Sequence, residues 1–381
     1  MRGAFQVARF FGIPVQVHWT FGLMLVGIAY LSYSRGLDWS GTAQFTLFFI
    51  VLFICVIFHE FGHALTARRF GVNTRDIILS PIGGVARLDK LPDSPIQEFL
   101  VAVAGPVVNI AIALSVLPYI LLQPQTRQQL INIFDPNSNV FFINLSFLDY
   151  FLFGVFLLNI TLAGFNLLPA FPMDGGRILR ALLSIRLGRI KATRLSTYIG
   201  QGIAVLFVIW GILDGNLLIP FIGLFVFVTA AGENRMVQMD SLLEQYQVKA
   251  LLRRFYTRIY VQDPMERPVE ELTHGLEHNF LVFDEWQNLV GTLSEEQLMK
   301  AVERKDFGSP VSAYLHPGID AVVSDDNLRT AVQKLQSGEY GILPVFEKNA
   351  LVGVVDAQSI NNFIAIQKGR QKDKKKGYVP Q

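Results

Sequence analysis

The sequence has a single cysteine, Cys55, among its 381 residues. One cysteine excludes an internal disulfide bond, and it also excludes a metal cage built from several thiolates. Charged residues are scarce as well: they make up 17% of the chain against 51% for apolar residues, a balance typical of membrane proteins. The net charge of +2 indicates no particular partner, and no nucleic-acid partner is expected.

The scarcity of charge is confined to the first part of the chain. Residues before about Met236 form long apolar stretches, whereas those after it are rich in Glu, Asp, Lys and Arg. We therefore predict a polytopic α-helical membrane domain over residues 1–235, a linker over 236–247 and a small α/β cytosolic domain over 248–366. The basic tail, residues 367–381, is predicted to be disordered.

About six apolar stretches approach the roughly 20 residues that a helix needs to cross a bilayer. They are Val17–Tyr33, Gln44–Ala67, Phe99–Leu122, Phe147–Leu168, Thr197–Leu213 and Leu217–Ala231. Basic residues crowd one set of connecting loops, whereas the opposite set holds only Arg35 and Arg127. Because basic loops stay in the cytoplasm, we expect both termini to be cytoplasmic. A bacterial inner membrane fits this topology best, and a photosynthetic or organellar membrane is compatible with it.

Two histidines and a glutamate interrupt the second apolar stretch. From Phe45 to Phe58 the chain carries no charge, and then His59, Glu60 and His63 occur within little more than one turn. Because residues i and i+4 share one face of a helix, His59 and His63 can bind one metal ion. Glu60 would then lie beside the metal, where it can take a proton from bound water. Ionisable groups at membrane depth are costly, which favours a functional pattern over a chance one.

A catalytic zinc site needs a third protein ligand and an open position for water. Asp174 is the best candidate, because it follows an apolar stretch on the same membrane side as His63 and stands between two prolines and two glycines. Broken backbone at membrane depth is tolerated where it lines a cavity. The alternative is that Asp174 only caps the next helix, which leaves the proline-rich break unexplained. Asn166 can offer its amide to the substrate or to a developing oxyanion, with helix–helix hydrogen bonding as the alternative.

These motifs resemble the paired signatures of the site-2 protease family, which are intramembrane zinc metalloproteases. The resemblance covers the membrane half of the chain. It implies one zinc ion (Zn²⁺) per chain, with His59, His63 and Asp174 as its ligands. It also implies that Glu60 is the general base and that Asn166 contacts the substrate or the transition state.

A glycine pair between the two motifs belongs to the same resemblance. Within Pro81–Arg87, Gly83 and Gly84 match a segment that in this family approaches the site and pairs with an extended substrate. Gly105 and Asn109, in the third apolar stretch, also match the family pattern, and we expect them to serve packing rather than chemistry.

The soluble part contains a weak internal repeat. The segment Leu281–Gly291 recurs as Pro344–Gly353, and each copy is typical of strand, turn, strand and then helix. The repeat resembles a tandem pair of cystathionine-β-synthase (CBS) domains, which often sense adenine nucleotides. The resemblance implies a regulatory module and a homodimer formed through it.

The residues that would bind an adenine nucleotide are incomplete in both copies. Ser294 follows the glycine of the first copy where the family carries threonine or serine, but Gln297 stands where it usually carries aspartate. In the second copy the corresponding residues are Asp356 and Ser359. Ser294 and Asp356 are the candidate nucleotide contacts, and the alternative is a pair of domains that binds no nucleotide.

The sequence thus predicts an intramembrane zinc endopeptidase that hydrolyses peptide bonds in membrane-embedded or membrane-associated regulatory proteins, as in regulated intramembrane proteolysis. Zinc would lower the pKa of its bound water to about 7, and Glu60 would pass the proton to the leaving amine. The expected partners are a transmembrane or membrane-associated protein substrate and the lipid bilayer. The cytosolic CBS pair would modulate the reaction.

Two other functions could use the same residues. A CBS-regulated transporter or channel could use them as an ion pathway, but such proteins commonly contain inverted repeats, and the apolar stretches show none. A proteolytically inactive scaffold could keep the metal, yet every expected catalytic residue is present.

Overall fold

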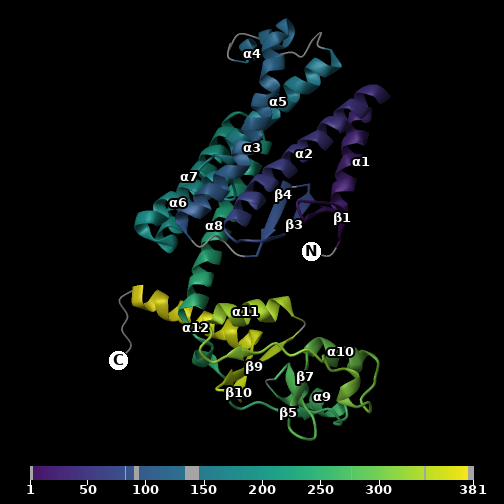
Figure 1. Cartoon of the computed structure of the whole chain (residues 1–381), viewed down its shortest axis with the longest axis vertical. Coiled ribbons are helices and arrows are strands. Elements are labelled where there is room, and N and C mark those ends of the chain that lie inside the picture. The colour runs from purple at the N-terminus through teal and green to yellow at the C-terminus, as the bar shows by residue number, and fades with distance from the viewer. Residues whose placement is uncertain are drawn as a thin grey trace. The chain divides into compact units, whose positions relative to one another are not determined.

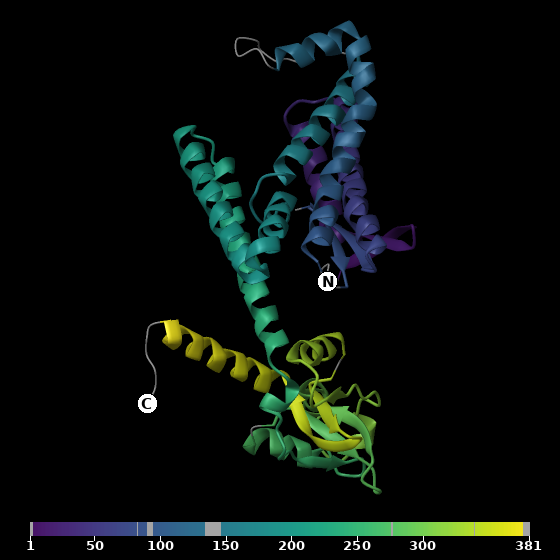
Figure 2. The ribbon, with the colours of Figure 1, turned by 60° about the vertical axis from the view of Figure 1, so that its left-hand side comes forward.

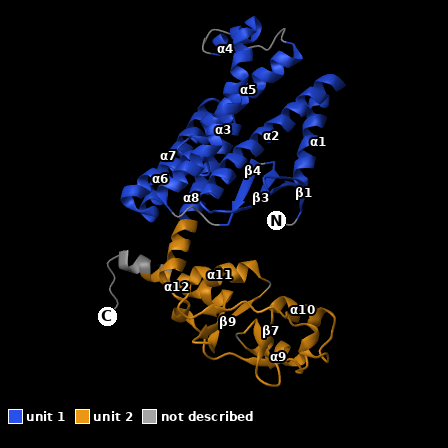
Figure 3. Ribbon diagram, in the orientation of Figure 1, with its two compact units in different colours: residues 1–235 blue, residues 236–381 orange. Residues whose placement is uncertain are grey.

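The computed structural model describes residues 3–81, 83–89, 94–133, 146–275, 277–338 and 340–375. The chain divides into two compact units, Met1–Arg235 and Met236–Gln381 (Figure 3). The division falls where long apolar stretches give way to ordinary soluble sequence. Each unit has its own buried clusters of apolar side chains, and each is described by itself below.

The first unit is built mainly from helices (Figure 1). They are α1 Trp19–Ser34, α2 Trp39–Arg69, α3 Pro95–Leu122, α4 Pro124–Asn132, α5 Phe147–Asn166, α6 Asp174–Leu187, α7 Arg189–Leu213 and α8 Leu218–Gln245. Among the described residues, five of these helices are long and apolar enough to cross a membrane: α2, α3, α5, α7 and α8. The predicted membrane domain is therefore confirmed, with five long spans.

The first of the six predicted spans differs from the others. Its helix, α1, has only 16 residues, because Val17 and His18 belong to a strand and not to the helix. His18 is the N-cap of α1, and its Nδ1 lies 2.7 Å from the hydroxyl of Thr20. The apolar stretch is thus divided between two elements, which shortens the helix below the length of the other five.

A four-stranded sheet lies at the C-terminal end of α2 (Figures 1 and 2). Its strands are β1 Ala4–Phe10, β2 Ile13–His18, β3 Thr74–Ser80 and β4 Gly83–Leu88, in the order β1-β2-β3-β4. β2 and β3 are parallel, and the other two pairs are antiparallel. Hydropathy does not predict β1 and β2, because both are short and β2 depends on pairing with the distant strand β3.

The sheet packs against the part of α2 that carries the histidine motif. Ile13, Val15 and Ile77 form a buried cluster with Phe61 and Ala64 of α2. At the free edge of the sheet, the guanidinium of Arg87 donates to Asp76, with 2.6 Å between Nε and Oδ1, and this bond raises the pKa of Arg87. The strands are therefore held both to each other and to α2.

The long helices approach one another closely at glycines. A Cβ at Gly62 of α2 would lie 2.7 Å from the carbonyl oxygen of Ala104 on α3. A Cβ at Gly223 of α8 would lie 2.7 Å from the carbonyl oxygen of Ala204 on α7, and Figure 2 shows these two helices side by side. Small residues at such crossings are typical of membrane helix packing.

The second unit contains two copies of one α/β arrangement. The elements of the first are η1 Val248–Leu251, β5 Arg258–Tyr260, α9 Glu266–His274, β6 Phe280–Phe283, β7 Leu289–Leu293 and α10 Glu295–Glu303. Those of the second are η2 Val311–Ala313, β8 Val322–Val323, α11 Leu328–Ser337, β9 Ile342–Glu347, β10 Ala350–Asp356 and α12 Ala357–Lys375. The sheets have the orders β5-β6-β7 and β10-β9-β8, each with one parallel and one antiparallel pair. The predicted small α/β region is confirmed.

The repeated glycines have the same role in both copies. A Cβ at Gly291 would lie 2.5 Å from the carbonyl oxygen of His316, and one at Gly353 would lie 2.5 Å from that of Arg253. Backbone bridges run beside each glycine, from Thr292 to His316 and from Arg253 to Val354. Each glycine therefore gives a neighbouring backbone segment room to pair with its hairpin.

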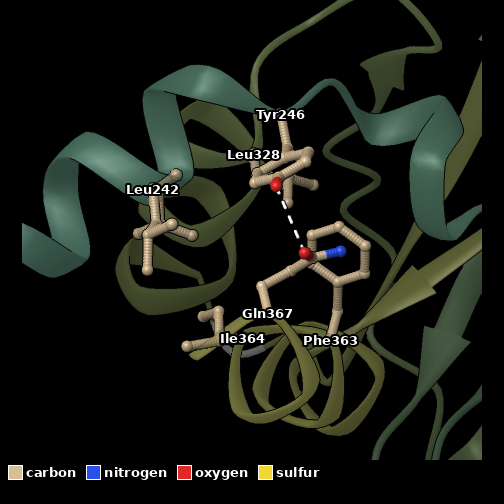
Figure 4. A pocket seen from close by; sticks show the side chains of 7 residues that line it. Leu242, Tyr246, Leu328, Phe363, Ile364 and Gln367 are labelled. Carbon is tan, nitrogen blue, oxygen red and sulfur yellow. Dashed lines mark hydrogen bonds between the residues drawn. The ribbon is translucent and has the colours of Figure 1, made fainter. Parts of the chain in front are cut away.

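The ends of the second unit differ from the prediction. Residues 236–245 of the predicted linker belong to α8, and residues 367–375 of the predicted disordered tail continue α12 as helix. Both segments are rich in residues that favour helices, which explains why they extend α8 and α12. The hydroxyl of Tyr246, which follows α8, donates a hydrogen bond to Gln367 of α12 at 3.2 Å (Figure 4). Residues 376–381 lie outside the described residues.

Candidate metal centre

The histidine motif lies near the C-terminal end of α2, where His59 and His63 are each 6% exposed. Their Nε2 atoms are 3.1 Å apart. The Oδ2 atom of Asp174 lies 3.1 Å from Nε2 of His59 and 3.1 Å from Nε2 of His63. The three residues proposed as ligands from the sequence thus meet at one buried point, although Asp174 is far along the chain.

The turn between α5 and α6 brings Asp174 to the histidines. α5 ends at Asn166, and α6 begins at Asp174, whose carboxylate faces the imidazoles; the N-cap residue of α6 is Met173. A Cβ at Gly175 would contact the carbonyl oxygen of Leu168. The turn can therefore fold back on the start of α6 only because that position is glycine, and the capping alternative for Asp174 does not describe its contacts.

The imidazole rings are oriented by hydrogen bonds on their other nitrogens. Nδ1 of His63 lies 2.7 Å from the carbonyl oxygen of Val101, which can only accept. Nδ1 of His59 lies 2.5 Å from Oδ1 of Asn109, and Asn109 in turn donates from Nδ2 to Asn159 at 2.8 Å. Both Nδ1 atoms therefore carry the proton, and in neutral rings both Nε2 atoms are acceptors.

This arrangement fits a metal ion. Two acceptor nitrogens and a carboxylate oxygen lie 3.1 Å from one another, which is unfavourable without a positive charge among them. Two imidazoles and one carboxylate are ligands that zinc takes in catalytic sites, and hydrogen bonds on the far ring nitrogens are the usual support. His59, His63 and Asp174 could hold such an ion.

Two residues of α3 support the histidines more closely than the sequence indicates. A Cβ at Gly105 would contact Nε2 of His63, so only glycine leaves room for the rings. Asn109, expected to serve packing, is fully buried and bonds to His59. Asn159 of α5 also donates to the sulfur of Cys55 at 3.3 Å. The presence of asparagines inside apolar helices was the sequence signal for these contacts, because an amide buried in a membrane needs a hydrogen-bond partner.

Glu60 lies beside β4, one of the two edge strands of the sheet. Its Oε2 atom accepts a hydrogen bond from the backbone N–H of Ala86 at 3.0 Å. A Cβ at Gly84 would lie 2.9 Å from Cγ of Glu60, so the strand approaches the carboxylate more closely than other residues would allow. The neighbouring Gly83 has φ of +135°, which also favours glycine. The glycine pair therefore lies next to the predicted base.

The other candidate residues lie outside the ligand cluster. Asn166, at the end of α5, is half-buried and starts the turn that leads to Asp174. In the second unit, Ser294 forms a capping box at the start of α10 with Gln297. Asp356 occupies the equivalent position of the second copy, where it accepts from the N–H of Ser359 at 2.7 Å. Both have a structural role in starting a helix.

Comparisons with known proteins agree on the first unit. The profile described as peptidase family M50 matches residues 47–210. A zinc metalloprotease of Methanocaldococcus jannaschii is 32% identical over 371 residues, which cover 96% of this chain and 97% of that protein. The solved structure of a site-2 protease from the same organism aligns with 61% of this chain and 95% of its own, at 36% identity and a TM-score of 0.43. A CBS-domain protein from Agrobacterium tumefaciens aligns with 30% of this chain and 91% of its own, at 18% identity and a TM-score of 0.29.

Proposed function

Because this chain belongs to peptidase family M50, as a zinc metalloprotease of the site-2 type, we propose that it cleaves membrane-embedded or membrane-associated regulatory proteins at the centre formed by His59, His63 and Asp174. The observation that carries the proposal is the meeting of three buried acceptor atoms, each 3.1 Å from the other two. His59 and His63 lie on the membrane-capable helix α2, and Asp174 follows the turn after α5, another such helix, which supports cleavage within the bilayer.

The chemistry divides between the ion and Glu60. A zinc ion held by the three residues would supply a Lewis acid for the scissile carbonyl and acidify a bound water. Glu60 would take the proton from the water and hand it to the leaving amine. Its Oε2 is held by the N–H of Ala86, so Oε1 is the atom that accepts the proton. Asn166, half-buried at the end of α5, would contact the substrate backbone or the developing oxyanion.

The substrate would bind as an added strand on β4. This strand is at the edge of the sheet, and its Gly84 lies directly against Glu60. An extended segment paired with Gly83 and Gly84 would present its peptide bonds beside the carboxylate. Local unwinding of a helical substrate is needed for this, because a helical carbonyl is shielded from attack.

We further propose that the second unit is a CBS pair that modulates the protease. α8 is one continuous helix whose first part belongs to the first unit and whose last residues belong to the second. An adenine nucleotide would contact Ser294 and Asp356 at the starts of α10 and α12, and two chains would pair through these domains. Both termini would be cytoplasmic, in agreement with the distribution of basic loops.

The first test is the zinc content of the purified full chain. One zinc per chain in the wild type, with a large loss in Asp174→Ala, would support the ligand set. Asp214→Ala is the matched control, because Asp214 is exposed at the end of α7. If the reconstituted wild type contains no zinc, the proposed metal site is wrong and an ion pathway is favoured. If Asp174→Ala binds zinc as tightly as the wild type does, only the assignment of Asp174 as the third ligand is wrong.

A further inference from the structure

Arg180 on α6 is a fully buried charge, with 0% of the residue exposed. Its Nε and NH2 atoms lie 2.6 Å and 2.5 Å from Oε1 of Glu98, in the first turn of α3. Its NH1 atom lies 2.5 Å from Oε1 of Glu233 on α8. Burying a charge is costly unless it is paired in good geometry, so this guanidinium needs both carboxylates.

The same guanidinium contacts the turn that leads to the metal centre. Its central carbon lies 5.1 Å from the ring centroid of Phe171, which is 1% exposed and precedes Asp174 in that turn. An arginine over an aromatic face is attractive, more so away from water. Arg180 therefore joins four segments: α6, α3, α8 and the turn before Asp174.

The contact with α3 also bears on the second ligand. Glu98 lies three residues before Val101, whose carbonyl oxygen orients His63. Residues at that spacing are neighbours on one helix face. The pair between Arg180 and Glu98 therefore connects the turn of α3 that supports His63 to the helix that begins with Asp174.

We propose that Arg180 is a positioning residue for the metal ligand Asp174, held in place by Glu98 and Glu233. This inference rests on the metal site of the proposed function. Arg180 fixes α6 and the Phe171 turn against α3, and thereby keeps Oδ2 of Asp174 at 3.1 Å from both Nε2 atoms. Glu233 makes α8 part of this support, with its side chain 27% exposed.

The test compares Arg180→Lys and Glu233→Gln in the full chain in detergent. Lysine keeps the charge but loses the planar fork that reaches both carboxylates. Glutamine removes one charge at the partly exposed end and leaves the pair with Glu98. The matched controls are Arg186→Lys, exposed on the same helix α6, and Asp240→Asn on α8.

Zinc affinity is measured by competition with a chelator, the absorption spectrum of the Co²⁺ form reports ligand geometry, and circular dichroism follows thermal unfolding. We expect both variants to bind zinc at least about tenfold more weakly, with an altered Co²⁺ spectrum, while the controls match the wild type. Variants that bind zinc as tightly, with an unchanged spectrum, would overturn the inference. A lower unfolding temperature alone would also overturn it, because it would show a role in stability only.

Glu233→Gln decides the outcome if Arg180→Lys does not fold, since it leaves the buried pair intact. Failure of the wild type to bind zinc is a different result: it removes the proposed function and this inference together. Zinc binding by the wild type that is insensitive to both substitutions removes the inference alone.

Discussion

The Nδ1 atom of His59 on α2 lies 2.5 Å from the Oδ1 atom of Asn109 on α3. Asn109 is fully buried and is itself held by Asn159 on α5. This chain of bonds sets the tautomer of His59, and so determines which nitrogen faces Asp174. A metal ligand on one helix is thus oriented through side chains of two others.

Asn109→Ala is predicted to weaken zinc binding by about 10–100-fold, because His59 loses the acceptor that fixes its ring. Zinc affinity by chelator competition measures this. Ser115→Ala, at an exposed position of the same helix, is the control and should bind zinc as the wild type does. Equal affinity in both variants would show that the bond to His59 has no effect on the metal.

Gly105→Ala is predicted to lower zinc affinity by at least about tenfold, because the new Cβ would contact the imidazole of His63. Gly164→Ala is the control: it lies in α5 with no atom within 4 Å of its Cβ position, and alanine there should stabilise the helix by roughly 0.5–1 kcal/mol. Zinc titration of both variants measures the difference. Wild-type affinity in Gly105→Ala would mean that the rings can move without loss of the site.

Glu60→Gln is predicted to lower the rate of peptide cleavage by about 10²–10⁴-fold while zinc content stays at the wild-type level. Glutamine can still accept the bond from the N–H of Ala86, but it cannot take a proton. A panel of fluorescent transmembrane peptides in detergent measures cleavage. Removal of zinc with a chelator should abolish cleavage by the wild type, and zinc should restore it; cleavage by Glu60→Gln at the wild-type rate would exclude Glu60 as the base.

Gly353→Ala is predicted to destabilise the second unit by about 1–3 kcal/mol, because the new Cβ would lie 2.5 Å from the backbone oxygen of Arg253. Hydrogen exchange of the amides in β9 and β10 of the full chain measures this. Gly369→Ala, with open space at its Cβ position in α12, is the control and should not destabilise. Faster exchange in Gly353→Ala, with zinc affinity unchanged, is the expected pair of results.

Ser294→Ala is predicted to destabilise α10 by about 1 kcal/mol, because it removes the capping box with Gln297. If an adenine nucleotide also binds there, the affinity for ATP measured by calorimetry should fall in Ser294→Ala and in Asp356→Ala. The capping loss alone, with ATP affinity unchanged in both variants, would remove the nucleotide from the proposed function and leave the helix starts as the role of these residues.

Local sequence predicted the parts of the molecule that depend on local physics. Helical periodicity requires His59 and His63 to share a face, and a run of apolar residues requires burial or a membrane whatever surrounds it. Prolines and glycines around Asp174 predicted the break before α6, and the repeated strand–turn–strand pattern predicted the two α/β copies.

Only the tertiary structure decided which distant residues support these parts. Asn109 and Asn159 bond within the bundle, Arg180 pairs with carboxylates on two other helices, and β2 pairs with β3 across the whole of α1 and α2. No periodicity records such contacts, because each depends on how helices pack and on which buried polar groups then need partners. Residue spacing can thus predict the ligands on α2, whereas the packing of α3, α5, α6 and α8 determines how those ligands are held.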